Sequence, residues 1–212
     1  MFKPVRWKTF LRDMVRIQFG FAMFGLAIAL LIRANLGTSA WAVLEVALAQ
    51  MMRLTPGTIS VGVGFLVLIF AMLLREQVGW GTLANILCIG PFEDLSLWLI
   101  PSIKDNLPLQ VGMLLAAILI MGLASAIYIG VDAGAGPRDS LMLAIERSTG
   151  WSVRISRGVL EVSVVLLGWL LGGPAGAGTL VFALLIGPAV QASFKLFNVL
   201  PARPLDTEVE DG

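Results

Sequence analysis

The chain carries one pattern twice, as GWGTLANILCIGP at residues 79–91 and as GAGTLVFALLIGP at residues 176–188. The two copies lie 97 residues apart, and eight of their thirteen positions are identical. Weaker echoes keep nearly the same offset, with residues 25–29 resembling 122–126 and residues 59–62 resembling 155–158. A repeated apolar segment predicts two related halves, which is a common plan of secondary transporters, with a site near the symmetry axis.

The composition indicates a polytopic membrane protein. Hydrophobic residues make up 58% of the chain and charged residues only 14%, and the mean hydropathy is +0.89, whereas soluble domains contain roughly 25% charged residues. A chain of 212 residues has room for about six crossings of roughly 20 residues each. We therefore expect no separate soluble domain, and the net charge of +1 indicates no particular partner.

Several kinds of chemistry are excluded by the residues that the chain lacks. It contains no His and a single Cys, Cys88, which excludes imidazole ligands to haem or zinc, an internal disulfide and an iron–sulfur cluster. It also lacks a phosphate-binding glycine loop, a nucleophile elbow and a basic face interleaved with aromatic residues. We expect no cofactor, no bound metal, no nucleic-acid partner and no enzymatic activity.

Six long apolar segments are expected to cross the bilayer, at residues 16–33, 58–74, 82–100, 110–131, 158–172 and 179–200. The second and fifth are short, so five crossings with one hairpin is the alternative. With a cytoplasmic N-terminus, twelve of the fifteen Lys and Arg fall on the inside, and only Arg33, Arg53 and Lys104 fall outside. This bias supports six crossings with both termini in the cytoplasm.

Three crossings per repeat is an odd number, so the second half enters the membrane from the opposite face and the repeats are inverted. Each half also contains a short helical segment after its first crossing, at residues 40–52 and 138–148. Ser39 can cap the first of these, and Pro137 suits the first turn of the second. We expect re-entrant or interfacial half-helices, whose glycine-rich entrances are candidate walls of a site.

Three motifs resemble a known family. They are NLGTSAW at residues 35–41, Gly-x-Gly-Thr-Leu at residues 79–83 and 176–180, and GPRD at residues 136–139. Together they resemble the bacterial YczE/YyaS/YitT family of integral membrane proteins over about residues 16–200. The resemblance implies a membrane architecture, a place in the inner membrane of a bacterial cell and a transport role, but no substrate. Members often carry Pro-Trp-Asp where this chain has Ala40-Trp41-Ala42, so only the second half retains a carboxylate there, Asp139.

Two acidic residues are candidates for coupling to a proton or a cation. Glu93 and Asp94 follow Gly90-Pro91 about halfway along the third crossing, where an ionised carboxylate is costly unless it is paired, hydrated or protonated. Their counterparts in the second half are Val190 and Gln191, so the pair belongs to one half only. The structural alternative is that the helix breaks at Pro91 and both carboxylates are hydrated in the outer interface.

Six further residues are candidates for binding a substrate: Asn35, Thr38, Ser39, Asn85, Arg138 and Asp139. Arg138 and Asp139 begin the second half-helix, whose N-terminus favours an anion that Arg138 could clamp. Alternatively, both residues lie in a cytoplasmic loop and pair with each other or with Arg154 and Arg157. Asn35, Thr38 and Ser39 form the equivalent entrance in the first half, with capping as their alternative role, and Asn85 could serve gating or helix contacts.

These patterns predict an all-α integral membrane protein of six transmembrane helices in two inverted three-helix repeats, each with a half-helix. We expect a basic cytoplasmic lead at residues 1–13, repeats at residues 14–108 and 109–200, and an acidic disordered tail at residues 201–212. The predicted function is secondary transport of a small organic anion or zwitterion, coupled to a proton or a cation. The alternative is an accessory subunit of a larger membrane complex, and the partners expected are a small-molecule substrate, the lipid bilayer, and a second copy or complex subunits.

Overall fold

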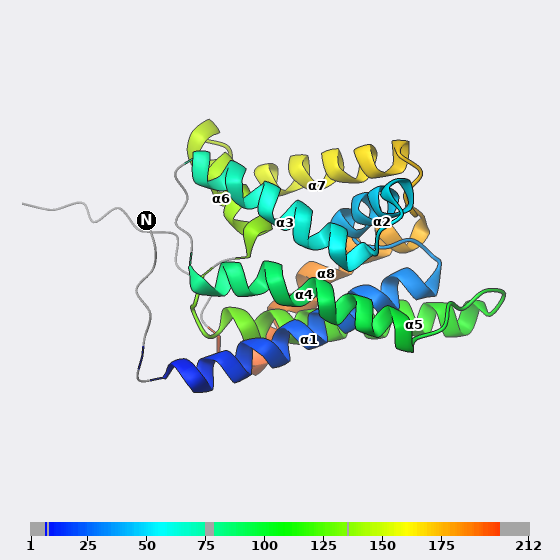
Figure 1. Ribbon diagram of the computed structural model, residues 1–212, viewed down its shortest axis with the longest axis horizontal. Helices are drawn as coiled ribbons and strands as arrows, with labels where there is room; N and C mark the ends of the chain where they lie inside the picture. Colours follow the sequence, from blue (N-terminus) through cyan, green and yellow to red (C-terminus); the bar gives the residue numbers. More distant parts are fainter. Residues whose placement is uncertain (1–6, 8, 75–78, 135, 200–212) are drawn as a thin grey trace, which may run out of the picture.

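The computed structural model describes residues 7, 9–74, 79–134 and 136–199, and within these ranges it contains eight helices and no strand (Figure 1). The helices are α1 (Phe10–Ala34), α2 (Ala40–Met52), α3 (Pro56–Leu73), α4 (Trp80–Leu99), α5 (Leu107–Ile129), α6 (Pro137–Thr149), α7 (Val153–Leu170) and α8 (Ala177–Leu196). The predicted all-α class is therefore confirmed. The predicted lead overlaps the start of α1, and the predicted acidic tail lies outside the described residues.

The helices form two groups that lie one above the other in Figure 1. In the first group α1 packs against α4 and α5, and α5 packs against α8. In the second group α2 packs against α3 and α7, and α6 packs against the same two helices. The two groups meet chiefly where α3 packs against α4.

The two short helices appear where the capping residues predict them. Helix α2 follows Ser39, which has extended backbone, and ends at Arg53 with a left-handed φ of 57°. Helix α6 has Pro137 in its first turn and ends at Gly150 with a φ of 72°. The two helices lie at opposite ends of the bundle (Figure 1).

The turn before each half-helix packs against the repeated Gly-x-Gly-Thr segment of the other half. The backbone N–H of Gly178 donates to the Leu36 carbonyl at 2.7 Å, and that of Gly81 donates to the Ala133 carbonyl at 3.0 Å. Each turn contains a glycine in the left-handed region, Gly37 with φ +111° and Gly134 with φ +130°. A Cβ added to either glycine would lie within 2.8 Å of a threonine hydroxyl in the facing segment, so the small residues of the repeat allow this close approach.

Neither of the two Gly-Pro steps breaks its helix. Helix α4 runs without interruption through Pro91, and α8 runs through Pro188. A proline removes one hydrogen bond within a helix, and membrane helices tolerate this loss where neighbouring groups compensate for it. Glu93 and Asp94 therefore belong to the helix body and not to a separate interfacial segment.

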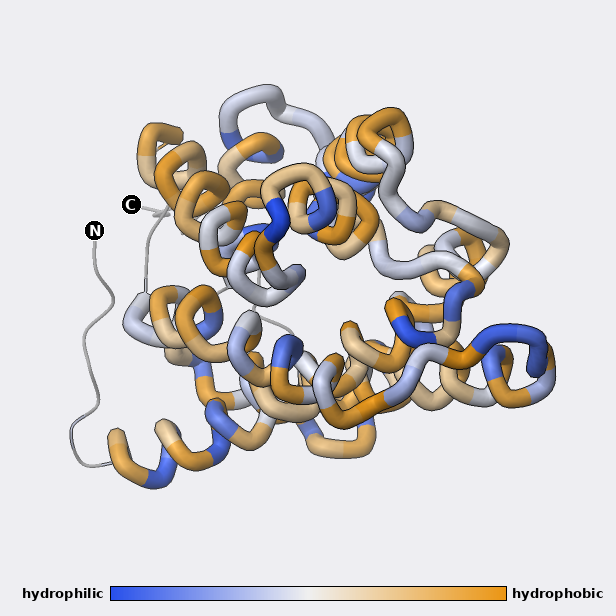
Figure 2. Tube along the Cα trace, turned by 45° about the vertical axis from the view of Figure 1, so that its right-hand side comes forward, coloured by the Kyte–Doolittle hydropathy of each residue, from blue (hydrophilic) through white to orange (hydrophobic). Residues whose placement is uncertain are grey.

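Within the described residues, four helices are long and apolar enough to cross a membrane: α1, α3, α5 and α8. Helices α4 and α7 have similar lengths, 20 and 18 residues, but contain more polar residues. The apolar sequence of α4 is interrupted by Glu93 and Asp94, and that of α7 by Arg154, Arg157 and Glu161. Figure 2 shows hydrophobic colouring along most of the helical trace, with hydrophilic positions as short interruptions.

Candidate functional site

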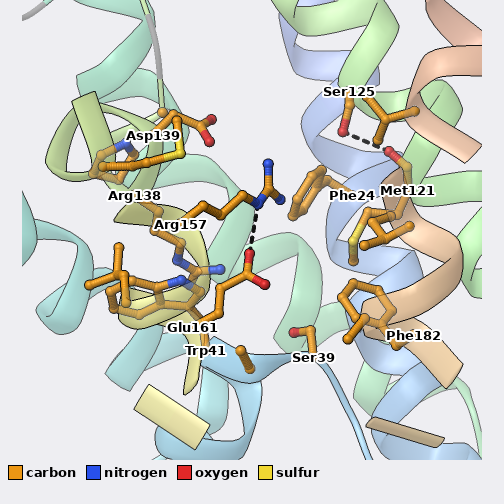
Figure 3. A pocket seen from close by; sticks show the side chains of 18 of the residues that line it. Phe24, Ser39, Trp41, Met121, Ser125, Arg138, Asp139, Arg157, Glu161 and Phe182 are labelled. Atoms are coloured by element: carbon orange, nitrogen blue, oxygen red, sulfur yellow. Dashed lines mark hydrogen bonds and ion pairs between the residues drawn. The ribbon is translucent and has the colours of Figure 1, made fainter. Parts of the chain in front are cut away.

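A cavity of about 420 Å³ lies between the two helix groups, with residues of both groups in its wall. Its two sides differ in character, as Figure 3 shows. Arg138 and Asp139 of α6, Arg157 and Glu161 of α7, and Trp41 of α2 form one side. Phe24 of α1, Met121 of α5 and Phe182 of α8 form the other. A charged wall facing an apolar wall suits a small amphiphilic ligand, and the volume lies within the usual range for ligand pockets.

The charged wall is centred on an ion pair that joins the two half-helices. The guanidinium of Arg138, in the first turn of α6, donates to Oε1 of Glu45 on α2. The same nitrogen lies 3.4 Å from the Ser60 hydroxyl, and the guanidinium carbon lies 5.1 Å from the centre of the Trp41 ring. Glu45 is completely buried, whereas 26% of the Arg138 side chain is exposed, so Arg138 connects a buried carboxylate to the cavity.

A second ion pair joins Arg157 and Glu161, which lie one helical turn apart on α7. Nε of Arg157 donates to Oε1 of Glu161 at 2.8 Å, which confirms the pairing that their four-residue spacing suggests. The two side chains are 53% and 33% exposed, so solvent screens the pair and its contribution to stability is about 0–1 kcal/mol. Both residues line the cavity.

The cavity opens to the surface between α7 and α8. Several of its lining residues are also exposed on the outside, among them Val162 and Leu166 of α7 and Leu180 of α8. Helices α7 and α8 do not form an interface like that between α3 and α4 in the described part of the chain. Gly90 contacts the backbone of Gly57 in the closed pair, whereas its counterpart Gly187 has open space beside it. The two halves of the chain therefore differ: α3 and α4 of the first half are in close contact, whereas the equivalent helices α7 and α8 of the second half are apart.

The structure brings four of the six predicted binding residues to the cavity: Ser39, Asn85, Arg138 and Asp139. Thr38 precedes α2 and is completely buried beside the cavity without lining it. Asn35 serves a structural role, because its amide nitrogen donates to the Ser102 hydroxyl at 2.6 Å and to the Ile103 carbonyl at 2.9 Å. It thereby ties the end of α1 to the segment before α5.

Neither predicted coupling residue lines the cavity. Asp94 accepts hydrogen bonds from the Thr55 hydroxyl at 2.5 Å and from the Gly57 backbone N–H at 2.9 Å, so it holds the start of α3 against α4. Glu93 is completely buried, and neither of its carboxylate oxygens has a hydrogen-bond partner among the described residues. It lies against α1, where a Cβ on Gly25 would meet its backbone nitrogen.

Glu45 is the residue of this site that the sequence does not single out as a ligand or coupling residue. It lies 93 positions from Arg138 in the chain, and no spacing rule relates two helices that distant. The available signal is a carboxylate in an otherwise apolar half-helix, AWAVLEVALAQMM. Such a residue requires a buried partner, and Arg138 is that partner.

Residues 11–195 match the model of a family of unknown function, DUF6198. The chain belongs to this family. It is 32% identical to the uncharacterized membrane protein YczE of Bacillus subtilis over 205 residues, covering 94% of this chain and 92% of the relative. An uncharacterized protein of Haemophilus influenzae is 32% identical over 200 residues, covering 94% and 91%.

The uncharacterized protein YyaS of Bacillus subtilis is 28% identical over 171 residues, covering 79% of this chain and 85% of the relative. No solved structure matches the chain. The relatives named YczE and YyaS confirm the family resemblance of the sequence motifs. The membrane description of YczE agrees with the apolar helices found here, and the chain is a membrane protein of this family.

Proposed function

We propose that this protein is a secondary transporter of a small organic anion or zwitterion in the bacterial inner membrane. The observation that carries the proposal is the cavity between the two helix groups, with one charged and one apolar wall. Both half-helices begin at this cavity, α2 through Ser39 and Ala40 and α6 through Gly136 and Pro137. Helix N-termini that meet at a site between two bodies are a recurring feature of transporters.

In this proposal α1, α3, α4, α5, α7 and α8 cross the bilayer, and the two halves are inverted repeats. The reciprocal packing of the turns at Gly37 and Gly134 against the repeated segments supports a two-fold relation. The polar residues that lower the apolar character of α7 do not all face lipid, because Arg157 and Glu161 line the cavity. Glu93 of α4 is buried in the protein, so a crossing by α4 does not place this carboxylate in lipid.

The charges of the site define the ligand. The half-helix N-termini and the guanidinium groups of Arg138 and Arg157 favour an anionic group. Asp139 and Glu161 lie in the same wall and would receive the ammonium group of a zwitterion. Phe24, Met121 and Phe182 face them, so the body of the ligand should be apolar.

The test begins with thermal unfolding of the purified chain in detergent against a panel of monocarboxylates and amino acids. Hits are then tested for uptake into proteoliposomes. Arg157→Gln should weaken binding and uptake of every anionic hit because it removes a cation from the cavity. Arg154→Gln is the matched control, since Arg154 is exposed on the same helix and does not line the cavity. Equal losses in both variants, or a panel without hits, would count against the proposal.

The second candidate function is that of an accessory subunit, without catalytic activity, in a larger membrane complex. The observation that favours it is the parted pair α7 and α8, whose exposed apolar residues include Leu166, Trp169, Leu170, Leu180 and Leu184. A partner helix or a second copy of the chain could cover this opening. Sizing the complex purified in mild detergent and identifying the proteins that co-purify distinguishes the two functions, because a transporter should be recovered as a monomer or a homodimer.

A further inference from the structure

We infer that Glu45 binds the proton that accompanies an anion into the cavity, so that transport is anion–proton symport. The inference rests on the proposed function and adds the coupling ion and the residue that holds it. Its basis is the ion pair between Glu45 and Arg138, in which one partner is completely buried and the other faces the cavity. Arg138 therefore serves both the buried carboxylate and the ligand.

The surroundings of Glu45 offer no second cation in contact with it among the described residues. Oε1 accepts from Arg138, and Oε2 is buried without a hydrogen-bond partner there. Ser60 of α3 is the nearest polar neighbour, and Glu93 of α4 adds a further carboxyl group that interacts with Glu45. Asp139, Arg157 and Glu161 lie in the cavity wall. The negative charge of Glu45 is thus held by Arg138.

An anion in the cavity competes with Glu45 for Arg138. A buried carboxylate that loses its partner costs several kcal/mol if it stays ionised, and Glu45 has no exposed surface through which water could replace Arg138. Proton uptake removes this cost. In the bound state the anion pairs with Arg138. Glu45 has then taken up a proton from the solution and is a neutral carboxylic acid. One negative and one positive charge enter together, so the net charge of the site is unchanged.

The same argument does not apply to Glu161 or to Glu93. Glu161 loses Arg157 when an anion binds that guanidinium, but its side chain is 33% exposed, so water can solvate the carboxylate. Glu93 makes no hydrogen bond to Arg138, so its immediate contacts do not change when Arg138 turns to the ligand. Glu45, in contrast, is completely buried, and anion binding at Arg138 removes its ion-pair partner.

Proton uptake can be measured directly on the purified protein. The probes are acetate, hexanoate, decanoate and benzoate, titrated calorimetrically in two buffers of different ionisation enthalpy at the same pH. The difference in heat between buffers gives the number of protons bound per anion. We expect about one proton per bound anion for the wild type, as linkage requires when a single group changes its protonation state.

Glu45→Gln should still bind the probe, and more tightly, because Arg138 no longer has a competing carboxylate, but its proton uptake should fall to near zero. Glu93→Gln is the matched control and should keep the proton uptake of the wild type, because Glu93 is buried outside the cavity wall. If Glu45→Gln does not fold, infrared difference spectra of the wild type provide the readout. Anion binding should then produce a band of a protonated carboxyl group that shifts on isotopic labelling of Glu.

The outcomes separate the two levels of the proposal. Anion binding without proton uptake in the wild type, or uptake that persists in Glu45→Gln, would overturn the role of Glu45 and leave the transporter proposal standing. Loss of the uptake in Glu93→Gln alone would transfer the role to Glu93. Failure of the wild type to bind any of the four anions would contradict the proposed anion transport and the inference with it.

Discussion

Arg138 and Glu45 show how a residue-scale contact can organise a membrane site. The pair connects the first turn of α6 with the middle of α2, so it positions the two half-helices relative to each other. Trp41 lies against the guanidinium and restricts its orientation towards the cavity. Arg138 thus holds the two short helices together, and it is also the residue that we propose binds the ligand.

The energetic consequence can be tested with a double-mutant cycle. Arg138→Gln leaves the buried Glu45 without its partner and should lower the stability by about 3–5 kcal/mol at a pH where Glu45 stays ionised. The double variant Arg138→Gln with Glu45→Gln removes the buried charge as well and should recover most of this loss. Thermal unfolding in detergent measures both, with Arg154→Gln expected within about 0.5 kcal/mol of the wild type. A double variant as unstable as Arg138→Gln would show that the pair is not coupled in this way.

At the scale of elements, Asp94 links α4 to the start of α3. The sequence suggested this residue, together with Glu93, for coupling. Asp94 accepts from the Thr55 hydroxyl and the Gly57 N–H at the start of α3, where the helix dipole also favours a negative charge. The counterpart of Asp94 on α8 is Gln191, which is exposed, and α8 lacks the corresponding close contact with α7. The sequence difference between the halves therefore accompanies a difference in helix association.

Replacement of Asp94 should loosen α3. Asp94→Ala removes the acceptor of two hydrogen bonds and should lower the stability by about 1–3 kcal/mol, with faster hydrogen exchange at the first amides of α3. Gln191→Ala, at the equivalent position of the second half, should change neither quantity. Equal protection of these amides in Asp94→Ala and the wild type would show that other contacts hold α3 in place.

The two glycines of the repeated Ile-Gly-Pro element should respond in opposite ways to the same substitution. A Cβ on Gly90 would meet the backbone of Gly57 and come within 2.9 Å of a methyl group of Val61, whereas a Cβ on Gly187 meets no neighbour within 4 Å. Gly90→Ala should therefore destabilise by about 1–3 kcal/mol. Gly187→Ala should be neutral or stabilising by up to about 1 kcal/mol, the helix propensity of Ala over Gly. Chemical denaturation of the two variants side by side provides the measurement.

Local signals predict the elements well and their associations poorly. Helix α2 begins directly after Ser39, although the Ser39 side chain makes no capping hydrogen bond, and Pro137 marks the start of α6, because helix starts depend on a few adjacent residues. Asp94 and Asn35 were expected at the site but instead tie segments together, since their partners Gly57 and Ser102 are remote in the chain. A polar residue in an apolar sequence must have a partner, but the sequence does not say whether that partner is a ligand or another segment.

For the whole molecule, the two groups of four helices and the cavity between them suggest how a transporter of this build would move. The groups are joined at α3 and α4 and parted at α7 and α8, although the repeat makes the two helix pairs equivalent. In inverted repeats, exchange of such unequal arrangements between the halves opens the site alternately to the two sides of the membrane. The parted pair is thus expected to close when the joined pair opens.

Spin labels at equivalent positions of the two halves can test this exchange. In a Cys88→Ser background, one labelled pair is placed at Leu167 and Leu184 and the other at Phe70 and Leu87, all of them exposed and outside the cavity wall. A carboxylate that binds between the groups should shorten the distance between the labels at Leu167 and Leu184, because closure of α7 on α8 encloses the ligand. The population with a longer distance between the labels at Phe70 and Leu87 should grow. Pulsed electron paramagnetic resonance measures both distance distributions. If both remained unchanged at saturating ligand, the two groups would form one rigid body, and the opening between α7 and α8 would be a permanent feature that a partner or lipid must cover.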